Sequence, residues 1–306
     1  MISKHFIYTS LCFFFAVMTI HAQQIQDSKL ISLTERTQTS PEFIFKKFRE
    51  AGMNPTDHKL TDVERQKVNN ALSVLPPLHQ KILKEHLQSI SFMDNMPNTA
   101  LTSRIEPSDS LKMYNITFRA EILNQTISEW TTWKENTYYV KSPDDGYQIA
   151  IDAGNLDAFI YVLLHEATHV VDAVLDLTPH LNEQDVYVGS TAYTKNVWEK
   201  YNKISPNVIS PLLETTLFKT GKPMPVSNAT NVYKDLRETP FVSLYSTASW
   251  YEDLAEMLTI YHLTEKMKQP YKLVVKKNGI ETITYEPNKN KQVKKRQNQL
   301  QLFYKK

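Results

Sequence analysis

The pattern of apolar and polar positions changes several times along the chain, and its first part favours short helices. Ser40 before Pro41 has the residue types of a helix start, with a capping serine and a proline in the first turn. Thr61 is followed three residues later by Glu64, which is the spacing of a capping box. Helices are therefore expected over residues 41–48, 61–74 and 78–87.

The pattern then changes to partial alternation of β-branched and aromatic residues, which predicts strands. A hairpin is expected where residues 136–140 and 147–151 flank Pro143 and Gly146, since proline presets φ and glycine accepts a positive φ. An Asn-Gly pair at residues 278–279 marks a second hairpin. The expected strands are residues 90–93, 112–118, 136–140, 147–151, 271–275 and 280–285.

Two longer helices have the character of core elements. The first is expected over residues 156–175 with Asn155 as its N-cap, and its apolar stripe with few charges indicates burial. The second is expected over residues 250–268. Residues 177–240 are irregular and rich in proline, and residues 288–306 are basic with helical character. The fold class expected from these elements is α+β and helix-rich, with a small sheet.

The first 22 residues are typical of a secretory signal peptide. Lys4 and His5 form a basic start, and the apolar run over residues 6–20 is too short to span a membrane. Ala22 is the expected cleavage position, and a retained membrane anchor is the alternative. Residues 23–39 are polar and without pattern, which predicts a mobile leader.

Composition narrows the classes of protein and the compartment. The single cysteine, Cys12, lies inside the signal peptide, so the mature chain has neither disulfides nor thiol chemistry. This favours a secreted or periplasmic protein of a bacterium, with no transmembrane segment in the mature chain. The chain has 35 Lys and Arg against 33 Asp and Glu, so its charge gives no argument for nucleic acid.

A His-Glu-x-x-His segment is the strongest chemical signal. Positions four apart on a helix lie about 40° apart around its axis, so His165 and His169 point from one face and can bind one metal ion. Glu166 reaches the open side of the metal and can accept a proton from its bound water. The alternative is a pair of core histidines satisfied by hydrogen bonds.

Catalytic zinc takes three protein ligands and leaves one position for water, so a third ligand must come from elsewhere. Glu252 and Glu256 lie one turn apart on one face of the helix over residues 250–268. Together they offer a ligand and a carboxylate that orients a ligating histidine. Asp253, about 100° around that helix, is the nearest competitor. The other interpretation places both glutamates on a solvated face.

These motifs resemble the gluzincin metallopeptidases, and within them the lethal-factor-like branch. There the His-Glu-x-x-His segment continues into an apolar-apolar-Asp sequence, which ends here at Asp172, and a tyrosine stands seven residues before the ligand glutamate, here Tyr245. The resemblance implies that Glu252 is the third ligand and Glu256 the partner of His165. It also implies that Tyr245 donates to the developing oxyanion and that Asp172 supports the ligands from behind.

The resemblance implies a zincin-like fold and a secreted zinc metallopeptidase with one Zn²⁺ and a peptide or protein substrate. Glu166 is then the general base, and an extended substrate is expected to pair with the strand over residues 147–151, unless that strand is covered. The alternatives are a binding protein on a zincin scaffold without turnover, against which the intact Glu166 argues, or a zinc hydrolase acting on non-peptide or cell-wall amide bonds.

The predicted organisation is as follows. Residues 1–22 are the signal peptide, 23–39 the leader, 40–287 the zincin-like peptidase domain and 288–306 a basic C-terminal helix. Within the peptidase domain, the parts are an N-terminal helical part (40–88), the sheet and active-site helix (89–176), the irregular insert (177–240), the ligand helix (250–268) and a hairpin (271–286).

Overall fold

The computed structural model describes residues 32–105, 112–142, 145–180 and 189–305. The predicted signal peptide and the leader as far as residue 31 lie outside the described residues. The protein is 48% helical and 21% strand, with the strands in small sheets, which confirms the expected helix-rich α+β class.

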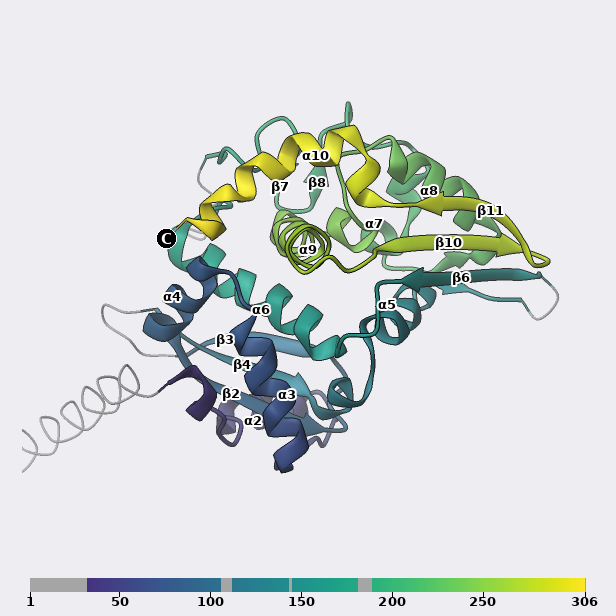
Figure 1. Ribbon diagram of the computed structural model, residues 1–306. Helices are drawn as coiled ribbons and strands as arrows, with labels where there is room; N and C mark the ends of the chain where they lie inside the picture. Colours follow the sequence, from purple (N-terminus) through teal and green to yellow (C-terminus); the bar gives the residue numbers. More distant parts are fainter. Residues whose placement is uncertain (1–31, 106–111, 143–144, 181–188, 306) are drawn as a thin grey trace, which may run out of the picture.

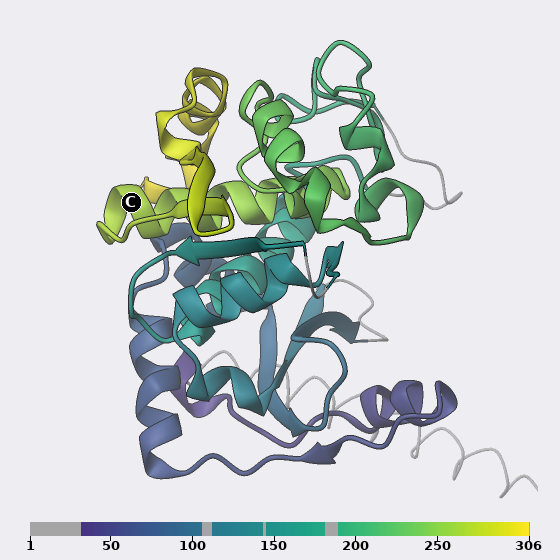
Figure 2. The same ribbon diagram turned by 90° about the vertical axis from the view of Figure 1, so that its right-hand side faces the viewer.

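Helix α6 (Ala158–Leu175) runs through the middle of the molecule, between an N-terminal and a C-terminal half (Figure 1). It packs against helices α3 (Asp62–Ser73) and α4 (Pro77–His86) of the N-terminal half and against α9 (Trp250–Tyr261) of the C-terminal half. In the turned view of Figure 2 the C-terminal half, green and yellow, again lies above the blue N-terminal half. The helix that carries both histidines is therefore held from two sides.

A four-stranded sheet supports α6 from the N-terminal half. Its order is β1 (Thr56–Asp57), β2 (Leu87–Asp94), β4 (Met113–Arg119) and β3 (Ala100–Ile105), with β2 and β4 parallel and the outer pairs antiparallel. The ring of Phe159 on α6 lies 4.8 Å from that of Phe118, centre to centre. Strands β2 and β4 were predicted, whereas edge strand β3 was not.

The N-terminal helices confirm the start signals in the sequence with small shifts. Thr61 and Glu64 form the predicted capping box at the start of α3, with the Thr61 side chain accepting from the Glu64 N–H. Helix α2 (Glu42–Glu50) has Pro41 rather than Ser40 at its N-cap. Likewise Asp157, not Asn155, is the N-cap of α6.

The end of the predicted leader is docked on the domain. Leu33 belongs to the core, and Arg36 is buried with its guanidinium donating to the carbonyl oxygens of Leu83 (3.0 Å) and Lys84 (2.9 Å). These carbonyls belong to the last turn of α4, where a helix has no partners of its own for them. The prediction of a mobile leader up to residue 39 is therefore wrong for residues 32–39.

The predicted hairpin over residues 136–151 is also wrong, and its turn lies partly outside the described residues. Helix α5 (Ile127–Asn136) ends where the first arm was expected to begin. Strand β5 (Tyr139–Val140) pairs in parallel with β9 (Met224–Pro225), and β6 (Tyr147–Asp152) pairs with β10 (Lys272–Lys277). Both partners are far away in the sequence, so alternation within the segment could not identify them.

The C-terminal half contains the second predicted hairpin and the ligand helix. Strands β10 and β11 (Ile280–Tyr285) pair across Asn278 and Gly279, whose φ angles of 51° and 79° are those of a tight hairpin turn. Together with β6 they form a three-stranded sheet. Helix α9 is followed by a π-helical turn (His262–Lys266), seen end-on in Figure 1.

The predicted insert and the C-terminal segment both fold onto α9. In addition to short pieces, the insert forms helix α8 (Ala229–Arg237). Helix α10 (Lys291–Gln297) and a 3₁₀ helix (Asn298–Tyr304) bury Leu300 and Phe303 completely. The remaining short elements are α7 (Leu217–Thr220), β7 (Trp198–Lys200) and β8 (Lys203–Ile204).

Helix α6 is long and apolar enough, by length and composition alone, to cross a membrane. However, 72% of this helix is buried inside the protein, as in the core helix of a soluble domain. This test therefore gives only weak evidence for a membrane span.

His79 on α4 is completely buried behind α6. Its Nε2 lies 3.0 Å from Thr168 Oγ1, and its ring stacks on Phe303 of the C-terminal segment with 5.3 Å between centres. Burial lowers the pKa of His79 to about 3. In the unfolded chain the pKa of a histidine is about 6.5, so below this pH the unfolded state binds a proton at His79 and the folded state does not. The resulting contribution to stability is full above pH 6.5 and is lost as the pH falls toward 3.

We predict that His79→Gln reduces the acid sensitivity of folding, because glutamine donates to Thr168 without titrating. Between pH 6.5 and 5 the free energy of unfolding of the wild type should fall by about 2 kcal/mol more than that of the variant. Urea unfolding at a series of pH values measures the difference. If the free energy of unfolding fell equally with pH in the two proteins, His79 would not be the cause of the acid sensitivity.

Candidate metal centre

Two helices meet at the centre and each supplies its residues from one face. On α6, His165 and His169 lie one turn apart with their Nε2 atoms 3.2 Å from each other. On α9, Ser249 caps the helix by accepting from the N–H of Glu252, at 3.3 Å. This cap starts α9 at Trp250, so the carboxylate of Glu252 comes from the first turn of the helix.

The carboxylate of Glu252 completes a group of three ligand atoms. Its Oε2 lies 2.9 Å from His165 Nε2 and 3.6 Å from His169 Nε2, and the three ligand atoms all lie within 4.8 Å of one another. Two atoms bound tetrahedrally at about 2.1 Å from one zinc ion are about 3.4 Å apart. The spacing of these three residues therefore fits a metal ion.

The electrostatics of the group favour positive charge between its members. Burial lowers the pKa of His165, but the hydrogen bond with Glu252 and the close carboxylates of Glu252 and Glu256 outweigh it and raise that pKa to about 10. Burial also lowers the pKa of His169, and the charge of Glu252 outweighs it and raises the pKa. Conversely, burial raises the pKa of Glu252, but the charge of His169 leads the effects that hold it well below its ordinary value. A divalent cation bound between these side chains would neutralise the same carboxylates that the protonated histidines neutralise.

Glu256 lies behind His165 and is 1% exposed. Its carboxylate accepts hydrogen bonds from Tyr161 Oη (2.9 Å), Ser243 Oγ (2.6 Å) and Lys134 Nζ (3.1 Å). Its Oε1 also lies 3.2 Å from His165 Nδ1, close enough for an ion pair although the angle is not that of a hydrogen bond. Burial raises the pKa of Glu256, but the charge of Lys134 leads the effects that lower it to about 2.

This arrangement places Glu256 where a carboxylate orients a ligating imidazole. The contact is on the Nδ1 side of the ring, so Nε2 of His165 is turned toward Glu252 and His169.

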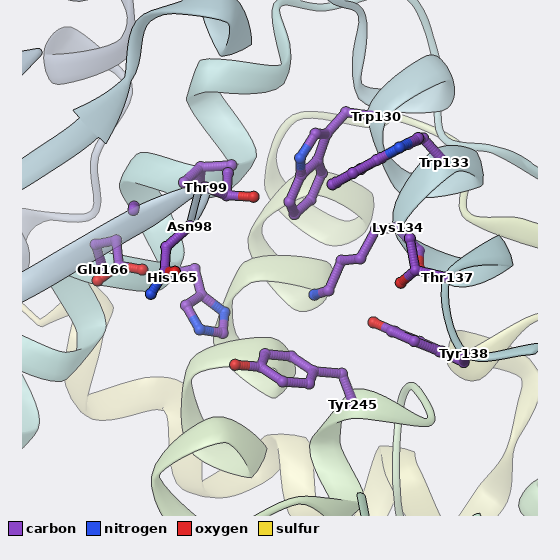
Figure 3. A pocket seen from close by; sticks show the side chains of 12 residues that line it. Asn98, Thr99, Trp130, Trp133, Lys134, Thr137, Tyr138, His165, Glu166 and Tyr245 are labelled. Atoms are coloured by element: carbon purple, nitrogen blue, oxygen red, sulfur yellow. The ribbon is translucent and has the colours of Figure 1, made fainter. Parts of the chain in front are cut away.

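Glu166 lies next to the first histidine and is held by a residue of the N-terminal sheet. The hydroxyl of Thr102 on edge strand β3 donates to Glu166 Oε2 at 2.7 Å. Both Glu166 and His165 line a cavity at this edge of the sheet (Figure 3). Since one oxygen of Glu166 is bound by Thr102, the orientation of the carboxylate is set by β3.

Tyr245 stands in the 3₁₀ turn (Tyr245–Thr247) before α9, next to His165. Its ring stacks on that of His165 with 5.9 Å between centres, and the hydroxyl end points to the histidine side of the cavity (Figure 3). The Nζ atom of Lys134 lies 4.1 Å from the centre of the Tyr245 ring. Burial raises the pKa of Tyr245 well above its ordinary value, so its hydroxyl keeps the proton and is a donor.

Two acidic residues named from the sequence lie away from the ligand atoms. Asp172 accepts from both the N–H and the hydroxyl of Thr178, each at 2.7 Å, and so fixes the chain after α6. Burial raises the pKa of Asp172, and the hydrogen bonds from Thr178 and the charge of His169 oppose this rise, so an electrostatic interaction with a ligating histidine remains. Asp253 pairs with Arg296, with its Oδ1 3.0 Å from Nη1, and is turned away from Glu252.

Sequence reasoning missed Thr102, Lys134, Tyr161 and Ser243. Only Tyr161 had a signal, because it stands four residues before His165 and therefore on the same face of α6. Thr102 reaches the site from strand β3, Lys134 from helix α5 and Ser243 from the loop before the 3₁₀ turn, so nothing in their own neighbourhood marked them.

No protein-family model matches the chain, and neither a curated protein nor a solved structure matches it. The support for a metal centre is therefore the geometry of the residues of this chain.

We predict that Glu252→Ala abolishes metal retention, because one of three ligand atoms is lost. Glu256→Ala should weaken metal affinity by about 10- to 100-fold, since it removes only the partner of a ligating histidine. Metal content after dialysis and calorimetric titration with Zn²⁺ measure both effects. Glu265→Ala, an exposed glutamate in the turn after α9, is the matched control and should bind as the wild type does. If Glu256→Ala were the more damaging change, the ligand would be Glu256.

Proposed function

We propose that the protein is a zinc-dependent metallopeptidase with a zincin-like fold, exported from a bacterial cell. The observation that carries the proposal is the convergence of His165, His169 and Glu252 with Glu166 one residue from the first ligand. The expected signal peptide supports export. Two imidazoles and one carboxylate are a ligand set of catalytic zinc in peptidases, with a fourth position left for water.

His165, His169 and Glu252 hold the single zinc ion of this proposal. When bound, zinc acts as a Lewis acid and lowers the pKa of a water molecule toward neutrality. The other residues of the centre then have separate tasks, which follow from their positions.

Glu166 is the proton acceptor of the proposed reaction. Its carboxylate takes a proton from the attacking water and passes it to the leaving amine. Thr102 binds one oxygen, at 2.7 Å, and thereby leaves the other oxygen available for the water. Tyr245, whose hydroxyl is protonated, donates a hydrogen bond to the oxyanion that develops on the substrate carbonyl.

The edge of the N-terminal sheet beside the centre can accommodate an extended peptide. Strand β3 is an edge of its sheet, with β4 on one side only, and Ala100 of β3 lines the cavity beside His165. A peptide that adds a strand to this edge runs past Glu166 and the ligand atoms. The strand expected from the sequence for this purpose, β6, is also an edge but pairs with β10 in the other sheet. We therefore assign substrate pairing to β3.

The central test of the proposed activity is Glu166→Gln. This variant should retain zinc, because Glu166 is not a ligand, and should lose hydrolysis by a factor of about 10²–10⁴ or more. Zinc content and digestion of a broad peptide library measure the two properties, with Glu265→Gln as control. A wild type that binds zinc but cleaves no peptide would favour a binding protein, or a hydrolase of other amide bonds if cell-wall fragments were cleaved. Full turnover by the variant would remove Glu166 from the mechanism.

A second prediction concerns Thr102, which touches the proton acceptor from the edge strand. Thr102→Val keeps the shape of the side chain but removes its hydroxyl, so kcat should fall about tenfold, as expected for a lost hydrogen bond to a charged group. The KM and zinc affinity should stay close to the wild-type values. Thr102→Ser restores the hydroxyl and should restore most of kcat. If valine and serine behaved alike, the hydrogen bond to Glu166 would have no part in turnover.

A further inference from the structure

A cavity of about 310 Å³ opens beside the candidate metal centre. His165 and Glu166 form one side of it, and residues of helix α5 form the other (Figure 3). This volume is larger than the space that a single water molecule needs, and it lies in the lower range of pockets that bind small organic groups. A group bound in this cavity would therefore lie next to the reacting atoms.

The wall formed by α5 is aromatic. Trp130, Trp133, Lys134 and Thr137 line the cavity, and their spacing of three, four and seven residues puts them on one face of the helix. Trp130 is 4% exposed and fixed in the core, whereas Trp133 is 47% exposed. The guanidinium of Arg119 lies 5.0 Å from the centre of the Trp133 ring, which holds that ring in place.

The inner end of the cavity adds two more rings, those of Tyr138 and Tyr245. Tyr138 is 4% exposed, and its hydroxyl end points toward Lys134 (Figure 3). This hydroxyl has no hydrogen-bond partner within the described part of the chain. Aromatic rings on several sides make a space suited to a flat apolar group, which gains from offset or edge-to-face contacts as well as from burial.

The charges at the cavity favour a neutral occupant. Lys134 is already paired with Glu256, with 3.1 Å between Nζ and Oε1, and its ammonium lies over the ring of Tyr245. Glu166, of opposite charge, faces the same cavity. An anionic side chain would lose its water without gaining an unpaired cation, because Lys134 is already bound to Glu256, and a cationic side chain would be repelled by the ammonium of Lys134.

We propose that this cavity is a specificity pocket that binds a neutral aromatic side chain of the substrate, next to the bond that is cleaved. The inference rests on the proposed peptidase function for its biological meaning. Trp130 and Trp133 stack against the ring of the substrate, and the ammonium of Lys134 lies near enough to the same space to attract the face of that ring. Trp133 is the residue that determines the preference for aromatic over aliphatic groups, since its exposed ring has room for a partner.

Binding of small probes tests the pocket without any turnover. N-acetyl-phenylalanine amide should bind the purified protein about fivefold more tightly than N-acetyl-leucine amide, and about tenfold more tightly than the glutamate and lysine analogues. Saturation-transfer NMR titrations measure these affinities on the metal-free and the zinc-loaded protein. Equal binding of the phenylalanine and leucine probes, or tighter binding of a charged probe, would overturn the proposal.

Two variants test whether Trp133 determines the preference of the pocket for aromatic groups. Trp133→Ala and the larger Trp133→Leu should both remove the advantage of the phenylalanine probe over the leucine probe. Both should fold, because the side chain is 47% exposed. The matched control is Phe43→Ala on α2, an aromatic residue 43% exposed, which should leave the advantage unchanged. An advantage retained in both Trp133 variants would overturn the role of this residue.

Peptide hydrolysis distinguishes the specificity pocket from the proposed peptidase activity. A set of peptides that differ only in having Phe, Leu, Ala or Glu beside the cleaved bond should give the highest kcat/KM with Phe, and Trp133→Ala should reduce the ratio of Phe to Leu about fivefold. Cleavage without preference for Phe refutes the pocket and leaves the peptidase standing. Binding of the phenylalanine probe that depends on Trp133, without cleavage of any peptide, supports the pocket and refutes the peptidase.

Discussion

The contact between the histidines of α6 and the carboxylates of α9 is the interaction on which the rest of the structure depends. His165 is 7% exposed and Glu256 1% exposed, so a charge on either side chain needs an opposite charge beside it in the interior. Glu252 and Glu256 lie one turn apart and reach the two sides of the His165 ring, Nε2 and Nδ1. The same pairs of charges that fix the two helices to each other also make a site for a cation.

Each half of the molecule serves to position one of these helices. The N-terminal sheet packs under α6 and extends edge strand β3 to Glu166 through Thr102. The C-terminal segment and the insert hold α9 at Asp253. Arg296 of the C-terminal segment forms a buried pair with this carboxylate, and Trp198 Nε1 of the insert donates to it at 2.9 Å. Asp253 is the neighbour of Glu252 in the sequence, so this pair also limits the rotation of α9. The centre therefore lies where α6 and α9, each held by its own half of the molecule, are in contact.

Much of the fold and the centre of the site could be predicted from the sequence. The capping box at Thr61, the hairpin at residues 278–279 and the apolar helix that carries His165 and His169 all depend on residues a few positions apart. The pairing of Glu252 with the histidines was predicted from helical spacing together with a resemblance. The error concerns a pairing partner: β6 was expected to pair with the strand over residues 136–140 and pairs with β10 instead.

The sequence by itself determined which residues share a helix face, because the hydrogen bonds of a helix join residues four apart and the direction of each side chain follows from that period. It thereby determined the pair of histidines and the pair of glutamates. Only the tertiary structure decided that Thr102 holds Glu166, that Lys134 neutralises Glu256 and that α5 forms an aromatic wall beside them. A side-chain hydrogen bond and a buried ion pair join residues that are 64 and 122 positions apart in these two cases, and no local pattern encodes such a distance.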